Sequence, residues 1–217
     1  MLPVSYVLDP ATYSGSQVNA LPVEPRTGRV PTTQQGGAVS SQHQIHQMTV
    51  GDRAHRIVTN ILNEGVEQER RTRTLQVSRH ARTVFRDHPV SYRPREALFD
   101  AVTAAGVYLH RFLLPTPWKV NGVEVQSGRS RLDIVYNKIG TGFLIDEMKL
   151  GIGRYGESAV REQVDRYLEL GQDTWGLSFL GVRLCAVHEP RQSRHHSPDG
   201  TSQLLTKSAL AEELCVR

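Results

Sequence analysis

The sequence contains few cysteines and no long apolar runs. Only two of its 217 residues are cysteines, Cys185 and Cys215, too few for a disulfide scaffold, a four-thiolate zinc site or a four-cysteine iron–sulfur cluster. No stretch approaches the ~18 apolar residues that span a membrane, and residues 1–4 show no sign of a secretory signal peptide. We therefore expect a protein of a reducing compartment, located in the cytoplasm, with no membrane partner.

The excess of one charge over the other is also small. The chain has 26 Lys and Arg residues against 22 Asp and Glu, a net charge of +4 and a pI near 9.3. Such a balance permits a nucleic-acid partner without requiring one. The length fits one domain, or one domain with a tail.

Residues 1–48 differ in composition from the rest of the chain. They are rich in Pro, Ser, Thr, Gln and Gly and show no lasting period of a strand or a helix. We predict an extended N-terminal arm or linker over residues 1–48 and a folded domain over residues 49–217. The alternative is that Val4, Tyr6 and Leu8, which alternate, form an edge strand of the domain.

Helical spacing of apolar residues marks two segments after the arm. The first helix is expected to begin near Thr49 and to end or be interrupted at Gly65, and the second to run from about Arg95 to Gly106. A basic stretch lies between them, with Arg70, Arg71, Arg73, Arg79, Arg82 and Arg86. This stretch predicts a phosphate-contacting surface, a solvated helix or a contact for an acidic protein.

From Trp118 onward the pattern becomes that of strands. We expect strands over 120–125, 131–136, 143–149 and 177–187, a helix over 157–170 that stops at Gly171, a polar tail over 191–200 and a short helix over 208–214. This order predicts an α/β protein with a mixed sheet covered by helices.

Two of these apolar strands carry charged residues. Alternation places Glu147 and Lys149 on one face of their strand and Asp146 on the other, so that Asp133 of the preceding strand can converge with Glu147 and Lys149. Burying such groups costs several kcal/mol unless they pair or bind a cation. Two carboxylates suit Mg²⁺ or Mn²⁺; the alternative is a structural Glu–Lys pair with Asp133 as an edge charge.

The spacing of these residues resembles the PD-(D/E)XK nuclease superfamily. Asp133 is followed 14 positions later by Glu147-x-Lys149, and the next helix carries Gln163-x-x-x-Tyr167, similar to the Q-x-x-x-Y motif of the RecB-like branch. Residues i and i+4 share one helix face, so both can point at the site. The resemblance covers roughly residues 95–190, although Leu132 stands where the family has Pro.

The resemblance implies a restriction-endonuclease-like fold and an Mg²⁺- or Mn²⁺-dependent deoxyribonuclease. Asp133 and Glu147 would hold the metal, and Lys149 would position the attacking water or help to deprotonate it. Gln163 would place Lys149 or a phosphate. The nucleic acid would be contacted by Arg161, Arg166 and Tyr167, with Arg154 beside them.

The first motif of the family, an acid or a His on the first core helix, has three candidates. Gly51-x-x-x-His55 and Gly106-x-x-x-His110 both resemble the RecB-type G-x-x-x-H, and Glu96 lies on the helix nearest the first strand. We expect His55 to be the third metal ligand, because its glycine opens a helix.

Two other patterns compete with this interpretation. Gly151-x-Gly153-x-x-Gly156 matches a dinucleotide-binding fingerprint, but the strand before it ends in charged residues and too few strands follow for a doubly wound sheet. Five histidines are compatible with zinc binding but lack partner cysteines: His43, His46, His188, His195 and His196.

The main functional alternative is a nuclease-fold module that has lost activity and only binds DNA or a protein partner. A small nuclease with a linker-like N-terminus also resembles delivered antibacterial toxin domains, which implies an inhibitory immunity protein as a partner.

Overall fold

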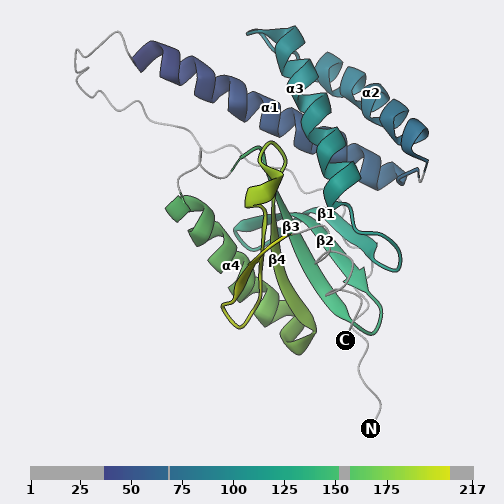
Figure 1. Cartoon of the computed structure of the whole chain (residues 1–217), viewed down its shortest axis with the longest axis vertical. Coiled ribbons are helices and arrows are strands. Elements are labelled where there is room, and N and C mark those ends of the chain that lie inside the picture. Colours follow the sequence, from purple (N-terminus) through teal and green to yellow (C-terminus); the bar gives the residue numbers. More distant parts are fainter. Residues whose placement is uncertain (1–36, 68, 152–156, 206–217) are drawn as a thin grey trace. The chain divides into compact units, whose positions relative to one another are not determined.

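Four α-helices and one six-stranded sheet make up the described part of the chain (Figure 1). The computed structural model describes residues 37–67, 69–151 and 157–205. The helices are α1 (Gly37–Glu64), α2 (Arg70–Asp87), α3 (Pro94–Val107) and α4 (Glu157–Trp175). The strands are β1 (Lys119–Ser127), β2 (Ser130–Lys138), β3 (Gly142–Lys149), β4 (Phe179–Ala186), β5 (Arg194–His196) and β6 (Ser202–Leu204). The prediction of a mixed α/β fold with helices over a sheet is confirmed.

The first helix begins earlier than the sequence predicts. We expected Thr49 to cap it, but α1 begins at Gly37, and the Thr49 hydroxyl donates to the Ile45 carbonyl at 2.8 Å inside the helix. Two compact units are distinguished along the chain, Met1–Gln35 and Gly36–Arg217, and the described residues belong to the second. Residues 1–36 of the predicted arm and the predicted helix over 208–214 lie outside the described residues.

The sheet is mixed and follows the chain order, β1-β2-β3-β4-β5-β6. β1, β2 and β3 form an antiparallel meander, whereas β3 and β4 are parallel and are connected through α4. A parallel pair needs such a crossover, which a hairpin turn cannot provide. The two short strands β5 and β6 add an antiparallel hairpin, of which β5 lies in the stretch 191–200 that we predicted to be a polar tail and β6 just after it.

Helices cover both faces of this sheet. One apolar cluster joins α1, α2 and α3 to residues such as Ile134, Leu144 and Cys185 of the central strands. A second cluster packs Val164 and Tyr167 of α4 against the opposite face, as Figure 1 shows for α4 and the strands beside it. The central strands β2 and β3 are therefore buried on both sides, which explains their nearly continuous apolar sequence.

The end of α4 corrects a second prediction. Gly171 was expected to stop the helix, but α4 continues to Trp175. A Cβ on Gly171 would lie 2.2 Å from Cζ of Phe179. This glycine therefore allows close packing against the start of β4 instead of ending the helix.

A buried ion pair joins the two parallel strands on the face opposite α4. Asp146 of β3 lies in register with Arg183 of β4, and both side chains are fully buried. The guanidinium donates to both carboxylate oxygens, at 2.6 and 2.5 Å, and to the Phe112 carbonyl at 2.8 Å. Tyr108 donates to the same carboxylate at 2.6 Å. The pair thereby ties the sheet to the π-helical segment Tyr108–Phe112 that follows α3.

No helix in the described part of the chain is both long enough and apolar enough to span a membrane.

Candidate active site

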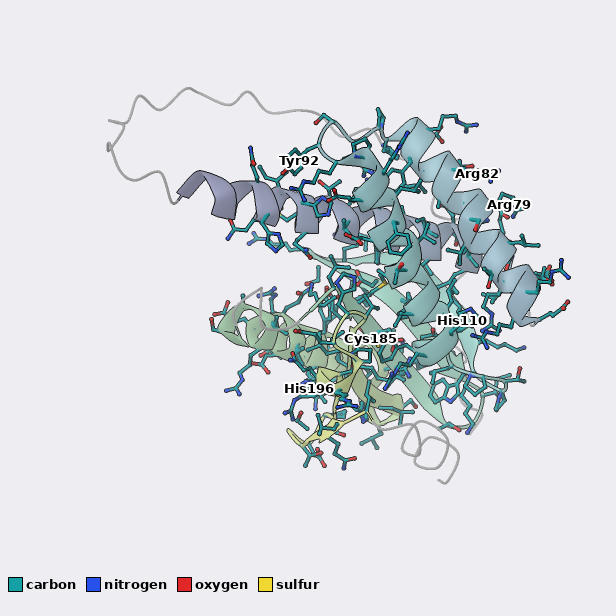
Figure 2. All side chains as sticks on the ribbon, turned by 45° about the horizontal axis from the view of Figure 1, so that its top comes forward. Arg79, Arg82, Tyr92, His110, Cys185 and His196 are labelled. Atoms are coloured by element: carbon teal, nitrogen blue, oxygen red, sulfur yellow. The ribbon has the colours of Figure 1, made fainter. Side chains whose placement is uncertain are left out.

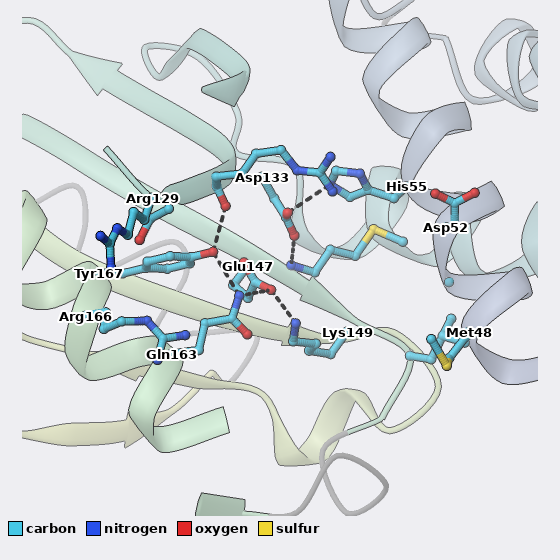
Figure 3. Close-up of a pocket in the computed structure, with 15 residues that line it drawn as sticks. Met48, Asp52, His55, Arg129, Asp133, Glu147, Lys149, Gln163, Arg166 and Tyr167 are labelled. Atoms are coloured by element: carbon cyan, nitrogen blue, oxygen red, sulfur yellow. Dashed lines mark hydrogen bonds and ion pairs between the residues drawn. The ribbon is translucent and has the colours of Figure 1, made fainter. Parts of the chain in front are cut away.

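A cleft of about 490 Å³ opens where α1 and α4 flank the ends of β2 and β3 (Figure 3). Figure 3 shows Asp133, Glu147 and Lys149 pointing into it from the strands, Gln163 from α4 and His55 from α1. The wall on the α4 side carries Arg166 and Tyr167, and the α1 wall carries Met48 and Asp52.

Asp133 lies where β2 and β3 separate. The ladder between the two strands ends at Ile134 and Asp146, and beyond it the Asp133 carboxylate accepts the Met148 N–H at 2.8 Å through Oδ2. The side chain thus replaces the next backbone hydrogen bond of the ladder. The other oxygen, Oδ1, faces the cleft. We call the point where β2 and β3 separate, between Asp133 and Met148, the fork. It explains how Asp133 and Glu147, on adjacent strands, can both face the cleft.

Glu147 is buried and shared by two donors. Its side chain is 3% exposed, and Oε1 accepts from Lys149 Nζ at 2.5 Å and from Gln163 Nε2 at 2.9 Å. The other oxygen, Oε2, is buried without a hydrogen-bond partner among the described residues. Burial, and then the charge of Asp133, raise the pKa of Glu147 to about 7. We expected Gln163 to place Lys149 or a phosphate; in the structure it contacts Glu147 directly.

Tyr167 of α4 forms hydrogen bonds beside the fork between β2 and β3. It is buried on α4, accepts from Gln163 Nε2 at 2.8 Å and donates to the Arg131 carbonyl at 2.7 Å. The Gln163-x-x-x-Tyr167 pair therefore bonds to both strands, to Glu147 on β3 and to the backbone before Asp133 on β2. The hydroxyl is occupied within the chain, and the contact of Tyr167 with nucleic acid stays a prediction.

His55 is the one of the three first-motif candidates that reaches the cleft. Its Nε2 lies 3.2 Å from Asp133 Oδ1, and its Nδ1 lies 2.5 Å from Glu124 Oε1. Glu96 is exposed on α3, where it pairs with Arg93 at 2.9 Å. His110 lines a separate cavity beside Arg70.

The charges of His55 and Asp133 stabilise each other. Burial by itself lowers the pKa of His55, but the contacts with Asp133 and Glu124 outweigh burial and raise this pKa to about 10. Burial likewise raises the pKa of Asp133, and contact with His55, followed by the Met148 N–H, outweighs it, so the net shift is downward. In the metal-free protein, His55 is therefore a cation and Asp133 an anion at neutral pH.

The donor atoms fit a hard divalent cation only in part. No three His, Cys, Asp or Glu side chains in the described ranges are already arranged as a metal centre. Glu147 Oε1 and Asp133 Oδ2 are both occupied within the chain. Glu147 Oε2 has no hydrogen-bond partner among the described residues, and Asp133 Oδ1 is in contact with His55 Nε2. Neighbouring ligands of an octahedral Mg²⁺ lie about 3 Å apart, comparable to the 3.2 Å between Asp133 Oδ1 and His55 Nε2. The residues thus fit Mg²⁺ or Mn²⁺ once the Lys149 contact is shared and His55 gives up its Nε2 proton.

Of the arginines predicted to contact nucleic acid, only Arg166 lines the cleft. Arg161 is exposed on α4 outside the cleft lining, and Arg154 lies outside the described residues. Gly153 and Gly156 of the glycine fingerprint also lie outside them. The basic stretch forms α2, and Figure 2 shows Arg79 and Arg82 on its outward side.

Sequence reasoning missed several residues of this cleft. Glu124 pairs with His55, Arg129 occupies the β1–β2 turn, and Met48 and Asp52 line the wall formed by α1. A signal existed for Met48 and Asp52, which lie seven and three residues before His55 and hence near it on the same helix face. No short-range signal identifies Glu124 or Arg129.

Comparisons with known proteins identify no relative of this chain. Neither a family model, nor a curated protein, nor a solved structure matches the chain. What bears on its function is therefore the geometry of the cleft.

Proposed function

We propose that the protein is a metal-dependent nuclease that hydrolyses phosphodiester bonds of DNA. The observation that carries the proposal is the convergence of Asp133, Glu147 and Lys149, from two neighbouring strands, in one open cleft. A buried Glu–Lys pair needs no cleft to be stable, and a structural Asp does not need an accessible oxygen. Their common location is expected of a site that handles a charged substrate.

The arrangement of elements supports a restriction-endonuclease-like core. An antiparallel meander of β1, β2 and β3 is followed by α4 and by a parallel β4. The acids lie at the fork between β2 and β3, and α4 adds Gln163 from the side. This is the order that the resemblance to PD-(D/E)XK nucleases implies.

The proposed cofactor is Mg²⁺ or Mn²⁺, held by Asp133 and Glu147 with His55 as a third ligand. When bound, such an ion polarises the scissile phosphate and acidifies a water molecule. Lys149 is held beside Glu147 by its 2.5 Å contact, so that its ammonium can orient the attacking water and offset the negative charge that develops on the phosphate oxygens. Gln163 keeps the Glu147 carboxylate in place.

Two arginines extend the cleft toward a nucleic-acid backbone. Arg129 and Arg166 both line it, both are exposed, and neither has an ion-pair or hydrogen-bond partner among the described residues. Unpaired arginines at the rim of a cleft are suited to phosphate contacts, which position the strand without reading its sequence.

The pairing of Glu147 with Lys149 favours a second candidate, a nuclease-fold module that binds DNA or a protein partner without cutting. Thermal melting separates the two, since a cation that binds only the native state raises the melting temperature. The nuclease proposal requires such a rise with Mg²⁺, and the binding module does not.

The deciding experiment is a cleavage assay of the full chain on closed circular plasmid, linear plasmid and RNA, with Mg²⁺, Mn²⁺ or excess EDTA. We expect metal-dependent nicking of the closed circle and no cleavage with EDTA. Cleavage that persists in excess chelator, or intact substrates under every metal condition, would overturn the proposal. Degradation of RNA alone would change the assigned substrate.

A further inference from the structure

Glu124 lies across from Asp133 on the neighbouring strand. The register of β1 and β2 pairs Val123 with Ile134 and Val125 with Leu132, which places Glu124 opposite Asp133. His55 reaches down from α1 and contacts both, Glu124 through Nδ1 and Asp133 through Nε2. One imidazole therefore bridges two carboxylates on adjacent strands.

The backbone of Glu124 is held in an unfavourable conformation. Its φ is +52°, in the left-handed region that residues other than glycine, Asn and Asp seldom adopt. The register of β1 shifts between Val120 and Gly122, just before this residue. Strained residues persist where surrounding contacts determine them, and they concentrate at functional sites.

Both oxygens of the Glu124 carboxylate are engaged. Oε1 lies 2.5 Å from His55 Nδ1, and Oε2 lies 2.7 Å from Arg131 Nε. Arg131 thus fixes the carboxylate, and the carboxylate fixes the imidazole. An imidazole ring has two broad orientations about χ2; with Nδ1 held in this way, Nε2 faces Asp133 Oδ1.

We propose that Glu124 is a positioning residue, which holds His55 by Nδ1 so that Nε2 faces the cation site at Asp133. This inference rests on the proposed function and deepens it. Metal-ligating histidines generally donate the other ring N–H to a carboxylate or carbonyl, which sets the ring orientation and tautomer. His55 Nε2 is buried 3.2 Å from Asp133 Oδ1, so a cation held by Asp133 would meet this nitrogen.

The first test measures Mn²⁺ affinity of the full chain by titration calorimetry in two variants. Glu124→Gln keeps the size of the side chain and removes its charge, and Glu124→Gly removes the side chain together with the backbone strain. We expect both to weaken binding about ten- to a hundredfold. The matched control is Glu64→Gln, because Glu64 also contacts a histidine, His80 at 3.1 Å, away from the cleft. This control should bind as wild type.

The second test does not depend on metal or activity. In the metal-free protein with ¹⁵N-labelled histidine, the Nδ1–H resonance of His55 should be protected from exchange with water and should lose this protection in Glu124→Gly. Wild-type metal affinity and retained protection in the variants would overturn the proposal. So would a lowered melting temperature with unchanged affinity, since that shows a purely structural role. If the wild type itself binds no metal, while protection of the Nδ1–H is present in it and lost in Glu124→Gly, the positioning role stands and the proposed function fails.

Discussion

Lys149 is the side chain on which the proposed chemistry depends most directly. Its side chain is 17% exposed, and its ammonium lies against Glu147 in the cleft. Replacing it by methionine keeps the apolar stem and removes the charge to which the proposal assigns orientation of the water and stabilisation of developing negative charge. We expect Lys149→Met to leave DNA binding nearly intact and to lower the rate constant for cleavage by about 10²-fold or more.

Single-turnover cleavage and a gel-shift titration, run side by side, check this prediction. The matched control is Lys119→Met, which removes an exposed lysine of β1 that does not line the cleft. Wild-type rates in Lys149→Met would remove this lysine from the chemistry.

The raised pKa of Glu147 predicts how metal binding varies with pH. Burial and the Asp133 charge hold this pKa at about 7 in the metal-free protein, so below pH 7 a cation must displace a proton. Mg²⁺ should therefore raise the melting temperature more at pH 8.5 than at pH 6. Titrations in two buffers of different ionisation enthalpy should show proton release near pH 6.

The same shift affects stability in the opposite direction. The folded-state pKa lies above the unfolded value of roughly 4.3, so the contribution of Glu147 to stability is present at acid pH and is lost as pH rises through about 7. The metal-free wild type should therefore be more stable relative to Glu147→Gln at pH 5 than at pH 8. A pH-independent difference between their melting temperatures would show that the pKa is not raised.

At the scale of elements, α1 decides which first-motif residue serves the cleft. His55 is the candidate that α1 brings to Asp133, whereas Glu96 and His110 lie elsewhere. We expect His55→Ala to reduce the rate of cleavage by at least tenfold, through weaker metal binding, and Glu96→Ala and His110→Ala to retain it. Rates at matched, saturating DNA and graded Mg²⁺ distinguish the three; a full rate in His55→Ala would exclude it as a ligand.

Replacing either of two helical glycines by alanine should change the free energy of unfolding, in opposite directions for the two sites. Gly171 of α4 packs against Phe179, so Gly171→Ala should lower the free energy of unfolding by roughly 1–3 kcal/mol through overpacking. Gly106 of α3 has open space around its Cβ position, so Gly106→Ala should raise this free energy by about 0.5–1 kcal/mol. Urea denaturation measures both, and a stabilised Gly171→Ala would show that the Phe179 ring can move aside.

Local sequence signals account for those parts of the fold that rest on short-range periodicity. Alternation placed Asp146 and Glu147 on opposite faces of β3, and the i, i+4 rule placed Gln163 and Tyr167 together. The start of α1 escaped prediction because residues 37–48 have too few apolar residues to show a helical period. Glu124 escaped because its contact depends on a register shift and a left-handed backbone, which only the paired strands impose.

At the scale of the whole molecule, the boundary of the folded unit can be tested by truncation. The division at Gln35 and the start of α1 at Gly37 predict that a chain beginning at Gly36 keeps its melting temperature and cleavage. A chain beginning at Met48 loses three turns of α1 and the His46–Asp100 contact at 3.3 Å to α3. We expect its melting temperature to fall by several degrees.

Thermal melting and plasmid cleavage of the two truncated chains decide between a boundary near residue 36 and the one predicted near residue 48. Equal melting temperatures for both would show that the first turns of α1 add nothing to stability.

The ion pair between Asp146 and Arg183 also has a consequence for strand alignment across the molecule. Strands can slide past one another during folding, and a one-residue slip would turn every side chain of β3 to the opposite face. A two-residue slip would restore the faces but leave Asp146 buried without its guanidinium, at a cost of several kcal/mol. Because Asp146 and Glu147 are adjacent, the alignment that pairs one with Arg183 also delivers the other to the cleft. The position of Glu147 on one face of the sheet thus depends on the ion pair on the other face.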